Sequence, residues 1–167
     1  MSARMKNPAA VLPEAVKPLQ ALYGVVQKGG VPPQTLHLVH LRASQINGCS
    51  VCVDMDWHGQ QKNGGIDKRT FAVAAWRDAP YFTDAERAAL ALTEAVTRLS
   101  DRQDPVPDAV WDEAARHFDE MALSALLLCI TTTNMWNRLN VATKQVAGAW
   151  MKVPQAREIV ERALAAK

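Results

Sequence analysis

Apolar residues recur at intervals of three and four along most of this chain, which is the period of amphipathic helices. Val16, Leu19, Leu22 and Val26 form the first such series, and they predict a helix over 14–28 that Gly29–Gly30 closes. Ala and Leu dominate, whereas the β-branched and aromatic residues are not gathered into the alternating runs typical of strands. The pattern therefore predicts an all-α protein.

Local start and stop signals divide the rest of the chain into further helices. Pro33 suits a first helical turn, Asn47–Gly48 suits a break, and Thr83 to Glu86 has the form of a capping box. The predicted ranges are 33–46, about 49–63, 67–76, 83–99, 109–118, 120–147 and 155–165. The segment 120–147 is apolar nearly all round in its first half and is predicted to be the buried central helix. We expect seven or eight helices in one domain over 13–167, after a flexible N-terminal stretch over 1–12.

Composition narrows the class of protein. A chain of 167 residues suits a single domain with a real core. The net charge is +2 and the charges are scattered, so we expect neither a nucleic-acid partner nor a membrane partner. The N-terminus lacks the apolar run of a signal peptide, and no window has the length of a membrane span, so a cytoplasmic location is expected. Cytoplasmic thiols are kept reduced, which favours a catalytic or metal-binding role for paired cysteines.

Cys49 and Cys52 form a C-x-x-C pair directly after the predicted break. A cysteine at a helix N-terminus meets free N–H groups and partial positive charge, which stabilise a thiolate and permit reversible disulfide chemistry. At about 100° per residue, Asp56 lies near the direction of both cysteines, whereas His58 lies about half a turn from Cys49. Asp56 rather than His58 is predicted to share their surface.

A metal site is the alternative use of the same pair. Cys49, Cys52, Asp56 and His37 would be a conceivable zinc ligand set, but the sequence has no second C-x-x-C and no H-x-x-x-H. The third cysteine, Cys129, stands in an apolar stretch and is predicted to be a core residue. We expect no bound metal.

The stretch LRASQINGCSVCVDM, residues 41–55, resembles the AhpD-like (alkylhydroperoxidase D) family of the carboxymuconolactone decarboxylase superfamily. The stretches that begin at Ala74 and Thr133 are similar to the family's middle section and final core helix, so the resemblance covers roughly 13–144. It implies the AhpD-like all-helical fold. It also implies a homo-oligomer, a trimer or a multiple of it.

The resemblance implies a thiol-dependent peroxidase or disulfide reductase. In members with the cysteine pair, the second cysteine attacks the peroxide and the first resolves it, which makes Cys52 peroxidatic and Cys49 resolving. The reductant is a dithiol, in some members a lipoyl group on a partner protein. The chemistry runs from thiolate to sulfenic acid to internal disulfide, and it needs no metal, haem or flavin cofactor.

Two positions depart from the family motif, which is a Glu, eleven residues, C-x-x-C, three residues and a His. His37 stands in place of the Glu, and Asp56 stands in place of the His. One interpretation is a swapped proton relay, with His37 as base or positive partner and Asp56 orienting it. The other is that the relay has been lost and peroxidase activity is weak.

Each of the other candidate site residues has both a functional and a structural interpretation. His40, one turn after His37, either assists the relay or is a surface residue; His58 serves only if its helix bends. His117 is predicted to lie at an exposed helix end. Arg42 and Gln45 either support the site or pack, with a salt bridge as one possibility for Arg42.

Aromatic and polar residues near the motifs leave similar alternatives. Trp57 either lines an apolar entrance for an organic peroxide or fills a subunit interface. Trp136, Asn137 and Arg138 are predicted to serve packing and oligomer contacts.

Two functional hypotheses from different classes follow. The first is an enzyme that reduces hydrogen peroxide or organic hydroperoxides. The second is a redox sensor or partner-binding module with a switchable Cys49–Cys52 disulfide. Ring-opening decarboxylase chemistry, a third possibility, is disfavoured because that branch of the superfamily does not rely on a cysteine pair.

Overall fold

The computed structural model describes residues 2–62, 67–100, 102–153 and 157, and within them the chain is all-α, as the sequence predicts. The elements, in chain order, are α1 (Pro8–Val11), η1 (Pro13–Ala15), α2 (Val16–Val26), α3 (Pro33–Ile46), α4 (Ser50–Lys62), α5 (Lys68–Ala72), η2 (Val73–Ala75), α6 (Asp84–Thr97), α7 (Asp108–His117), α8 (Glu120–Ala142) and η3 (Ala149–Lys152). The η elements are short 3₁₀ helices.

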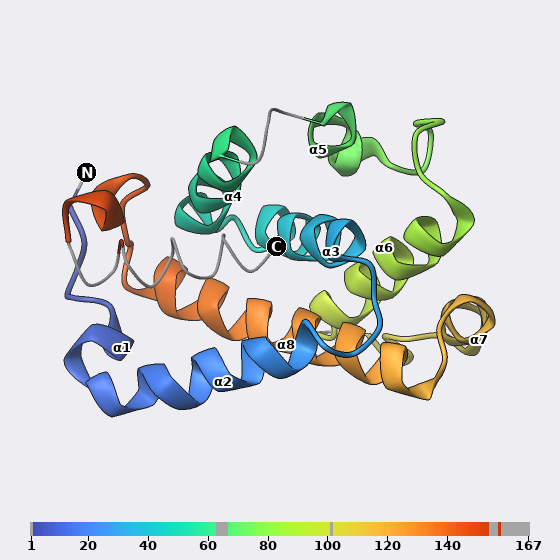
Figure 1. Ribbon diagram of the computed structural model, residues 1–167, viewed down its shortest axis with the longest axis horizontal. Helices are drawn as coiled ribbons and strands as arrows, with labels where there is room; N and C mark the ends of the chain where they lie inside the picture. Colours follow the sequence, from blue (N-terminus) through green and yellow to red (C-terminus); the bar gives the residue numbers. More distant parts are fainter. Residues whose placement is uncertain (1, 63–66, 101, 154–156, 158–167) are drawn as a thin grey trace.

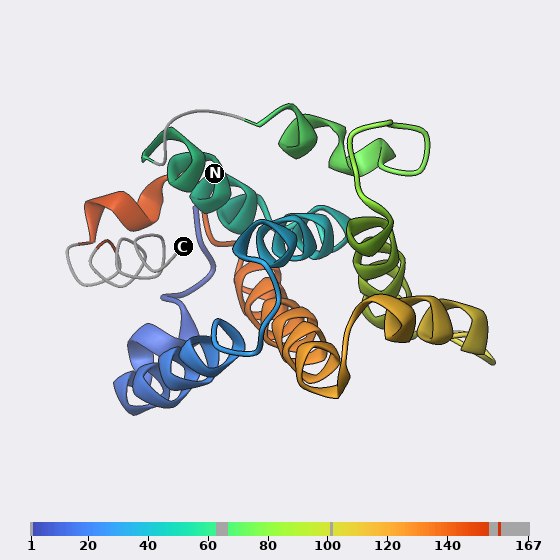
Figure 2. The ribbon, with the colours of Figure 1, turned by 45° about the vertical axis from the view of Figure 1, so that its right-hand side comes forward.

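Helix α8 is the central element, as its apolar sequence predicts. It crosses the whole molecule in Figure 1 and packs against α2, α3, α4, α6 and α7. Figure 2 shows α3 lying against α8 in the middle of the molecule, with α4 above and α6 and α7 to one side. Leu92, Leu126 and Ile130 are fully buried where α6 and α8 contribute to the largest core cluster. No helix in the described ranges has the length and apolar character that crossing a membrane requires.

Most helix boundaries agree with the prediction, and the differences have local causes. The predicted helix over 14–28 begins as η1 and becomes α2, and the segment 67–76 divides into α5 and η2. The prediction that the central helix continues to 147 is wrong: α8 ends at Ala142, and Lys144 takes a φ of 52°, which helical residues do not adopt. Helix α1 lies inside the stretch 1–12, whose flexibility stays a prediction. The predicted helix over 155–165 falls almost entirely outside the described residues.

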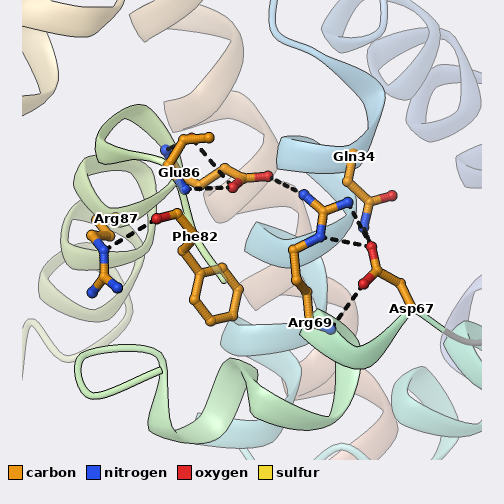
Figure 3. Close-up of polar contacts among 7 residues, drawn as sticks. Gln34, Asp67, Arg69, Phe82, Glu86 and Arg87 are labelled. Carbon is orange, nitrogen blue, oxygen red and sulfur yellow. Dashed lines mark hydrogen bonds and ion pairs between the residues drawn. The ribbon is translucent and has the colours of Figure 1, made fainter. Parts of the chain in front are cut away.

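Arg69 ties the segment after α4 to the body of the protein (Figure 3). Its guanidinium donates to Asp67, the N-cap of α5, at 2.7 Å and to Glu86 of α6 at 2.8 Å. Glu86 also accepts from the backbone N–H of Thr83, which completes the predicted capping box. Gln34 of α3 donates to Asp67 at 3.5 Å, so α3, α5 and α6 meet at this cluster.

Glu94 of α6 forms a second cluster that holds α3 and η2 in place. Its carboxylate accepts from Arg42 Nε at 2.7 Å, Trp76 Nε1 at 3.0 Å and Arg77 Nη1 at 2.8 Å, and it pairs with Arg98 at 3.2 Å. Burial alone would raise the pKa of Glu94, but these donors outweigh it and lower the pKa to about 2. Arg42 therefore forms a salt bridge, which was one of the possibilities for it. This bridge fixes α3, the helix that precedes the cysteine pair, against α6.

Candidate active site

The turn between α3 and α4 places the cysteine pair. Gly48 follows the C-cap of α3 with a φ of +66°, a left-handed conformation that glycine adopts without a Cβ penalty. Its N–H donates to Gln45 O at 3.2 Å, and the N–H of Cys49 donates to Ser44 O at 2.9 Å. These two bonds form a Schellman motif, which ends α3 and starts α4 one residue later. The predicted break at Asn47–Gly48 is thus a defined turn.

Cys49 is the N-cap residue of α4. Its carbonyl accepts the first helical hydrogen bond, from Val53 N at 3.1 Å, and its sulfur accepts from the backbone N–H of Cys52 at 3.3 Å. The sulfurs of Cys49 and Cys52 are joined in a disulfide, with Cα atoms 5.4 Å apart. The relative exposures are 1% for Cys49 and 3% for Cys52. Helix geometry and the cap together place both sulfurs at the positive end of α4.

A hollow of about 470 Å³ opens beside the disulfide, with Cys49 in its wall. Its lining residues come from the end of α3 and the first two turns of α4: Ser44, Gln45, Gly48, Cys49, Ser50, Val53, Asp54 and Trp57. Trp57 is 45% exposed at this hollow. Cys52 is not among the lining residues and packs with Val51 and Trp150 in a small buried cluster.

Side-chain amides from α8 reach the sulfurs. Asn137 Nδ2 donates to Cys52 Sγ at 3.0 Å, and Asn140 Nδ2 lies 3.5 Å from Cys52 Sγ and 3.7 Å from Cys49 Sγ. The sequence interpretation gave Asn137 packing and oligomer contacts, and its contact with Cys52 Sγ was missed. The available signal was the spacing of Asn134, Asn137 and Asn140, which places three amides along one side of an otherwise apolar helix.

His37 and Asp56 come together, as the swapped-relay hypothesis requires. His37 Nδ1 lies 3.0 Å from Asp56 Oδ1, and both side chains are buried between α3 and α4. The other ring nitrogen, Nε2, lies 2.9 Å from Gln60 Nε2. With the Gln60 amide as donor, the ring accepts at Nε2 and carries its proton on Nδ1, the nitrogen that lies 3.0 Å from the carboxylate.

His40 also faces this carboxylate, which gives it the assisting position considered for it. Its Nδ1 lies 3.7 Å from Asp56 Oδ1. Burial raises the pKa of Asp56, but the hydrogen bonds and charges of His37 and His40 outweigh it and hold the pKa well below its usual range. Asp56 is therefore ionised one helical turn after Cys52.

The remaining candidates lie apart from this centre. His58 faces Asp54 at 3.7 Å and the ring of Trp150, consistent with its predicted position half a turn from Cys49. His117 pairs with Glu113 at an exposed helix end, as predicted. Cys129 is buried in the main core, also as predicted. Within the described ranges, no group of three His, Cys, Asp or Glu side chains is arranged to hold a metal ion.

Comparisons with known proteins point to one family. The model of the carboxymuconolactone decarboxylase family matches residues 13–95. The chain is 30% identical over 132 residues to the uncharacterized protein YdfG of Bacillus subtilis (strain 168), covering 79% of this chain and 88% of that protein. It is 33% identical over 131 residues to the uncharacterized protein YnjA of Escherichia coli (strain K12), covering 78% and 70%.

Solved structures with the same fold include two of interest. One is a protein of unknown function from Agrobacterium tumefaciens, provisionally named the antioxidant defence protein AhpD. It has a TM-score of 0.79 and 32% identity, over 89% of this chain and 99% of that one. The other is the debrominase Bmp8, with a TM-score of 0.72 and 19% identity, over 92% and 79%, a likeness of fold alone.

Proposed function

Because this chain belongs to the AhpD-like branch of the carboxymuconolactone decarboxylase family, we propose that it is a thiol-dependent oxidoreductase that reduces hydroperoxides through Cys49 and Cys52. The observation that carries the proposal is the disulfide at the N-terminus of α4, with one sulfur in the wall of a hollow and the other against amide donors.

The oxidative half-reaction starts from the dithiol. The Cys52 thiolate attacks the outer peroxide oxygen, the O–O bond breaks, and the leaving alkoxide takes a proton to become an alcohol or water. Cys52 is then a sulfenic acid. The Cys49 thiol attacks its sulfur, water leaves, and the Cys49–Cys52 disulfide forms.

The reductive half-reaction needs a dithiol. One of its thiolates attacks Cys49 Sγ, which lines the hollow, and releases Cys52 as a thiolate. The second thiol of the reductant then resolves the mixed disulfide, so two electrons pass from the dithiol to the protein. A lipoyl group on a partner protein is the reductant that the family resemblance favours, and a homo-oligomer is the assembly it favours.

His37 and Asp56 are proposed to carry the proton in this cycle. Their 3.0 Å contact and the place of Asp56 one helical turn after Cys52 support the swapped relay over a decayed site, because an acid and an imidazole that had drifted independently would not be expected to stay buried within ion-pair distance. In the proposed cycle His37 Nε2 exchanges its contact with Gln60 for the proton of the Cys52 thiol and returns that proton to the leaving group, while Asp56 holds the imidazole through Nδ1.

A second candidate function is favoured by the burial of both sulfurs, which are 1% and 3% exposed. Poor access would slow reaction with peroxide and suit a redox sensor or partner-binding module, in which the same disulfide forms and breaks without rapid turnover.

One experiment separates the two. Reduced, chelator-treated protein is mixed with one equivalent of peroxide, thiols are counted with time, and the product is mapped by mass. For the enzyme we expect rapid loss of two of the three thiols, with a Cys49–Cys52 disulfide and Cys129 still reduced. The Cys49→Ser variant should stop at a Cys52 sulfenic acid that dimedone traps. Thiols that persist for many minutes would contradict the peroxidase and favour the sensor.

A further inference from the structure

We propose that Asn137 is a catalytic residue, whose side-chain N–H donates to the Cys52 thiolate, with Asn140 as a second donor. We call these two side chains the amide cradle. The proposal rests on the proposed function only for the identity of Cys52 as the sulfur that becomes a thiolate.

The amide cradle meets the sulfurs from one face of α8. Asn137 is fully buried, and its Nδ2 lies 3.0 Å from Cys52 Sγ, well within the reach of an N–H to sulfur bond. Asn140, one turn later, lies 3.5 Å from the same sulfur. His37, the side chain expected to stabilise the thiolate, instead directs its two ring nitrogens at Asp56 and Gln60. The side chains that the described residues direct at Cys52 Sγ as hydrogen-bond donors are thus neutral amides.

The hydrogen bonds of neighbouring residues determine which end of the Asn137 amide, Oδ1 or Nδ2, faces Cys52. Asn134 must direct Nδ2 at the carbonyl of Ile130, 2.8 Å away, because a carbonyl can only accept. Its Oδ1 then accepts from Arg138 Nη1 and from Asn47 Nδ2. The same Asn47 Nδ2 donates to Asn137 Oδ1 at 2.9 Å, which leaves the two N–H groups of Asn137 Nδ2 directed at Cys52 Sγ and at Ser44 Oγ, 3.1 Å away.

Asn140 is oriented by an independent route. Asn7 caps α1, where its Oδ1 accepts from the backbone N–H of Ala9 at 2.9 Å. Its Nδ2 is therefore the donor to Asn140 Oδ1, 2.8 Å away. Asn140 must then direct Nδ2 at the two sulfurs. Two separate chains of hydrogen bonds thus present donors, not acceptors, to Cys52.

Donors fixed in a buried site favour the charged form of an acceptor. A buried thiol is otherwise held protonated, because the thiolate loses its water. The amide cradle, together with the N-terminus of α4, replaces that water. It also makes Cys52 the better leaving group when a reductant attacks Cys49, since a stabilised thiolate leaves faster.

The test uses the Cys49→Ser background, so that Cys52 cannot re-form the disulfide. The rate of alkylation by iodoacetamide is measured against pH, and the label is assigned to Cys52 by mass. We expect Asn137→Leu, which keeps the volume but removes the donor, to raise the pKa of Cys52 by about one unit or more, a tenfold or larger change in acidity. A folded Asn137→Leu protein with an unchanged profile would overturn the proposal.

A second variant covers the case in which Asn137→Leu does not fold. Asn47→Asp keeps Asn137 in place but replaces its donor with an acceptor, so the Asn137 amide turns and directs its oxygen at the sulfur. The pKa of Cys52 should again rise. Gln145→Glu is the matched control, because it adds the same charge near the end of α8 at a side chain that bonds Met5 and Thr143 rather than sulfur. An equal shift in the control would assign the effect to charge and overturn the proposal.

Alkylation requires no peroxide, so the two proposals fail separately. A shifted profile in a protein that peroxide does not oxidise would refute the peroxidase and leave the amide cradle standing. An unshifted profile in a protein that does reduce peroxide would refute the amide cradle and leave the peroxidase standing.

Discussion

His37 Nδ1 lies 3.0 Å from Asp56 Oδ1 in a buried pair, although each residue stands where the AhpD-like motif has the other kind of side chain. Relative to the motif that the sequence resemblance implies, the acid and the imidazole stand on each other's helices, and α3 and α4 meet here through an imidazole and an acid. Two substitutions that look like the loss of a motif in sequence are compatible with one intact pair in space.

A charge-swap experiment tests whether the two residues act as a unit. We expect His37→Glu alone to cost about 3 kcal/mol of stability, since it buries two carboxylates side by side and breaks a buried pair. The double variant His37→Glu/Asp56→His restores the family order and should recover at least half of that loss. Urea unfolding of the four proteins in a double-mutant cycle measures the coupling. Strictly additive losses would contradict a coupled pair.

The relay hypothesis makes a separate prediction for reactivity. In His37→Ala, the proposed relay loses its imidazole, so the pKa of Cys52 should rise and its reaction with peroxide should slow. The measurement is stopped-flow oxidation of the reduced protein at several pH values. His117→Ala is the control, because His117 pairs with Glu113 at the exposed end of α7, and its rates should match the parent's. A folded His37→Ala protein with an unchanged Cys52 pKa would refute the relay.

The Glu94 cluster predicts acid sensitivity. The folded pKa of Glu94 is lowered from 4.5 to about 2, so its stabilisation is complete above about pH 5 and is lost as the pH falls from 4.5 towards 2. Glu94→Gln lacks this titration. Its stability deficit against the parent should be largest at neutral pH and should shrink through that window. Denaturant midpoints recorded across the window test this, and a constant deficit would contradict it.

Trp57 lies at the hollow beside Cys49, 45% exposed, and provides a test of substrate class. We expect Trp57→Ala to lower kcat/KM for an aromatic hydroperoxide about tenfold, a loss of about 1.4 kcal/mol of contact, and to leave hydrogen peroxide unaffected. Phe71→Ala is the control, since Phe71 is 72% exposed and is not among the hollow's lining residues. Size-exclusion chromatography of the Trp57→Ala variant tests the alternative interpretation, that Trp57 fills a subunit interface. An altered oligomer would favour that interpretation over a substrate entrance.

Features that depend on neighbours in the chain were predictable from the sequence. Helix α3 has the predicted bounds, Pro33–Ile46, because proline and Asn-Gly fix its ends locally. The Thr83 capping box is local in the same way. The end of α8 was not predicted because no glycine or proline marks it. The helix ends at Ala142, and the non-helical conformation follows at Lys144.

Features of the site that depend on packing were only partly predictable. Helical periodicity predicts Asp56 on the side of the cysteines and His58 about half a turn from Cys49, which needs no tertiary information. The structure places Asp56 against His37 and His40, and His58 against Trp150, which packs with the cysteines. The contacts of Asn137 and Asn140 with the sulfurs join residues more than 80 positions apart. They depend on how α8 crosses α4, which periodicity within one helix does not encode.

The bond between Asn7 and Asn140 has a practical consequence. Arg4 bonds the backbone at Ala142 and Thr143 beside it, so residues 4–7 lie against the end of α8 that carries Asn140. A purification tag at this terminus, or a protease that trims the first seven residues, would disturb the group that orients Asn140. Preparations that differ only at the N-terminus would then differ in thiol reactivity, and assays of this protein should compare tagged, cleaved and untagged material before any rate is assigned to it.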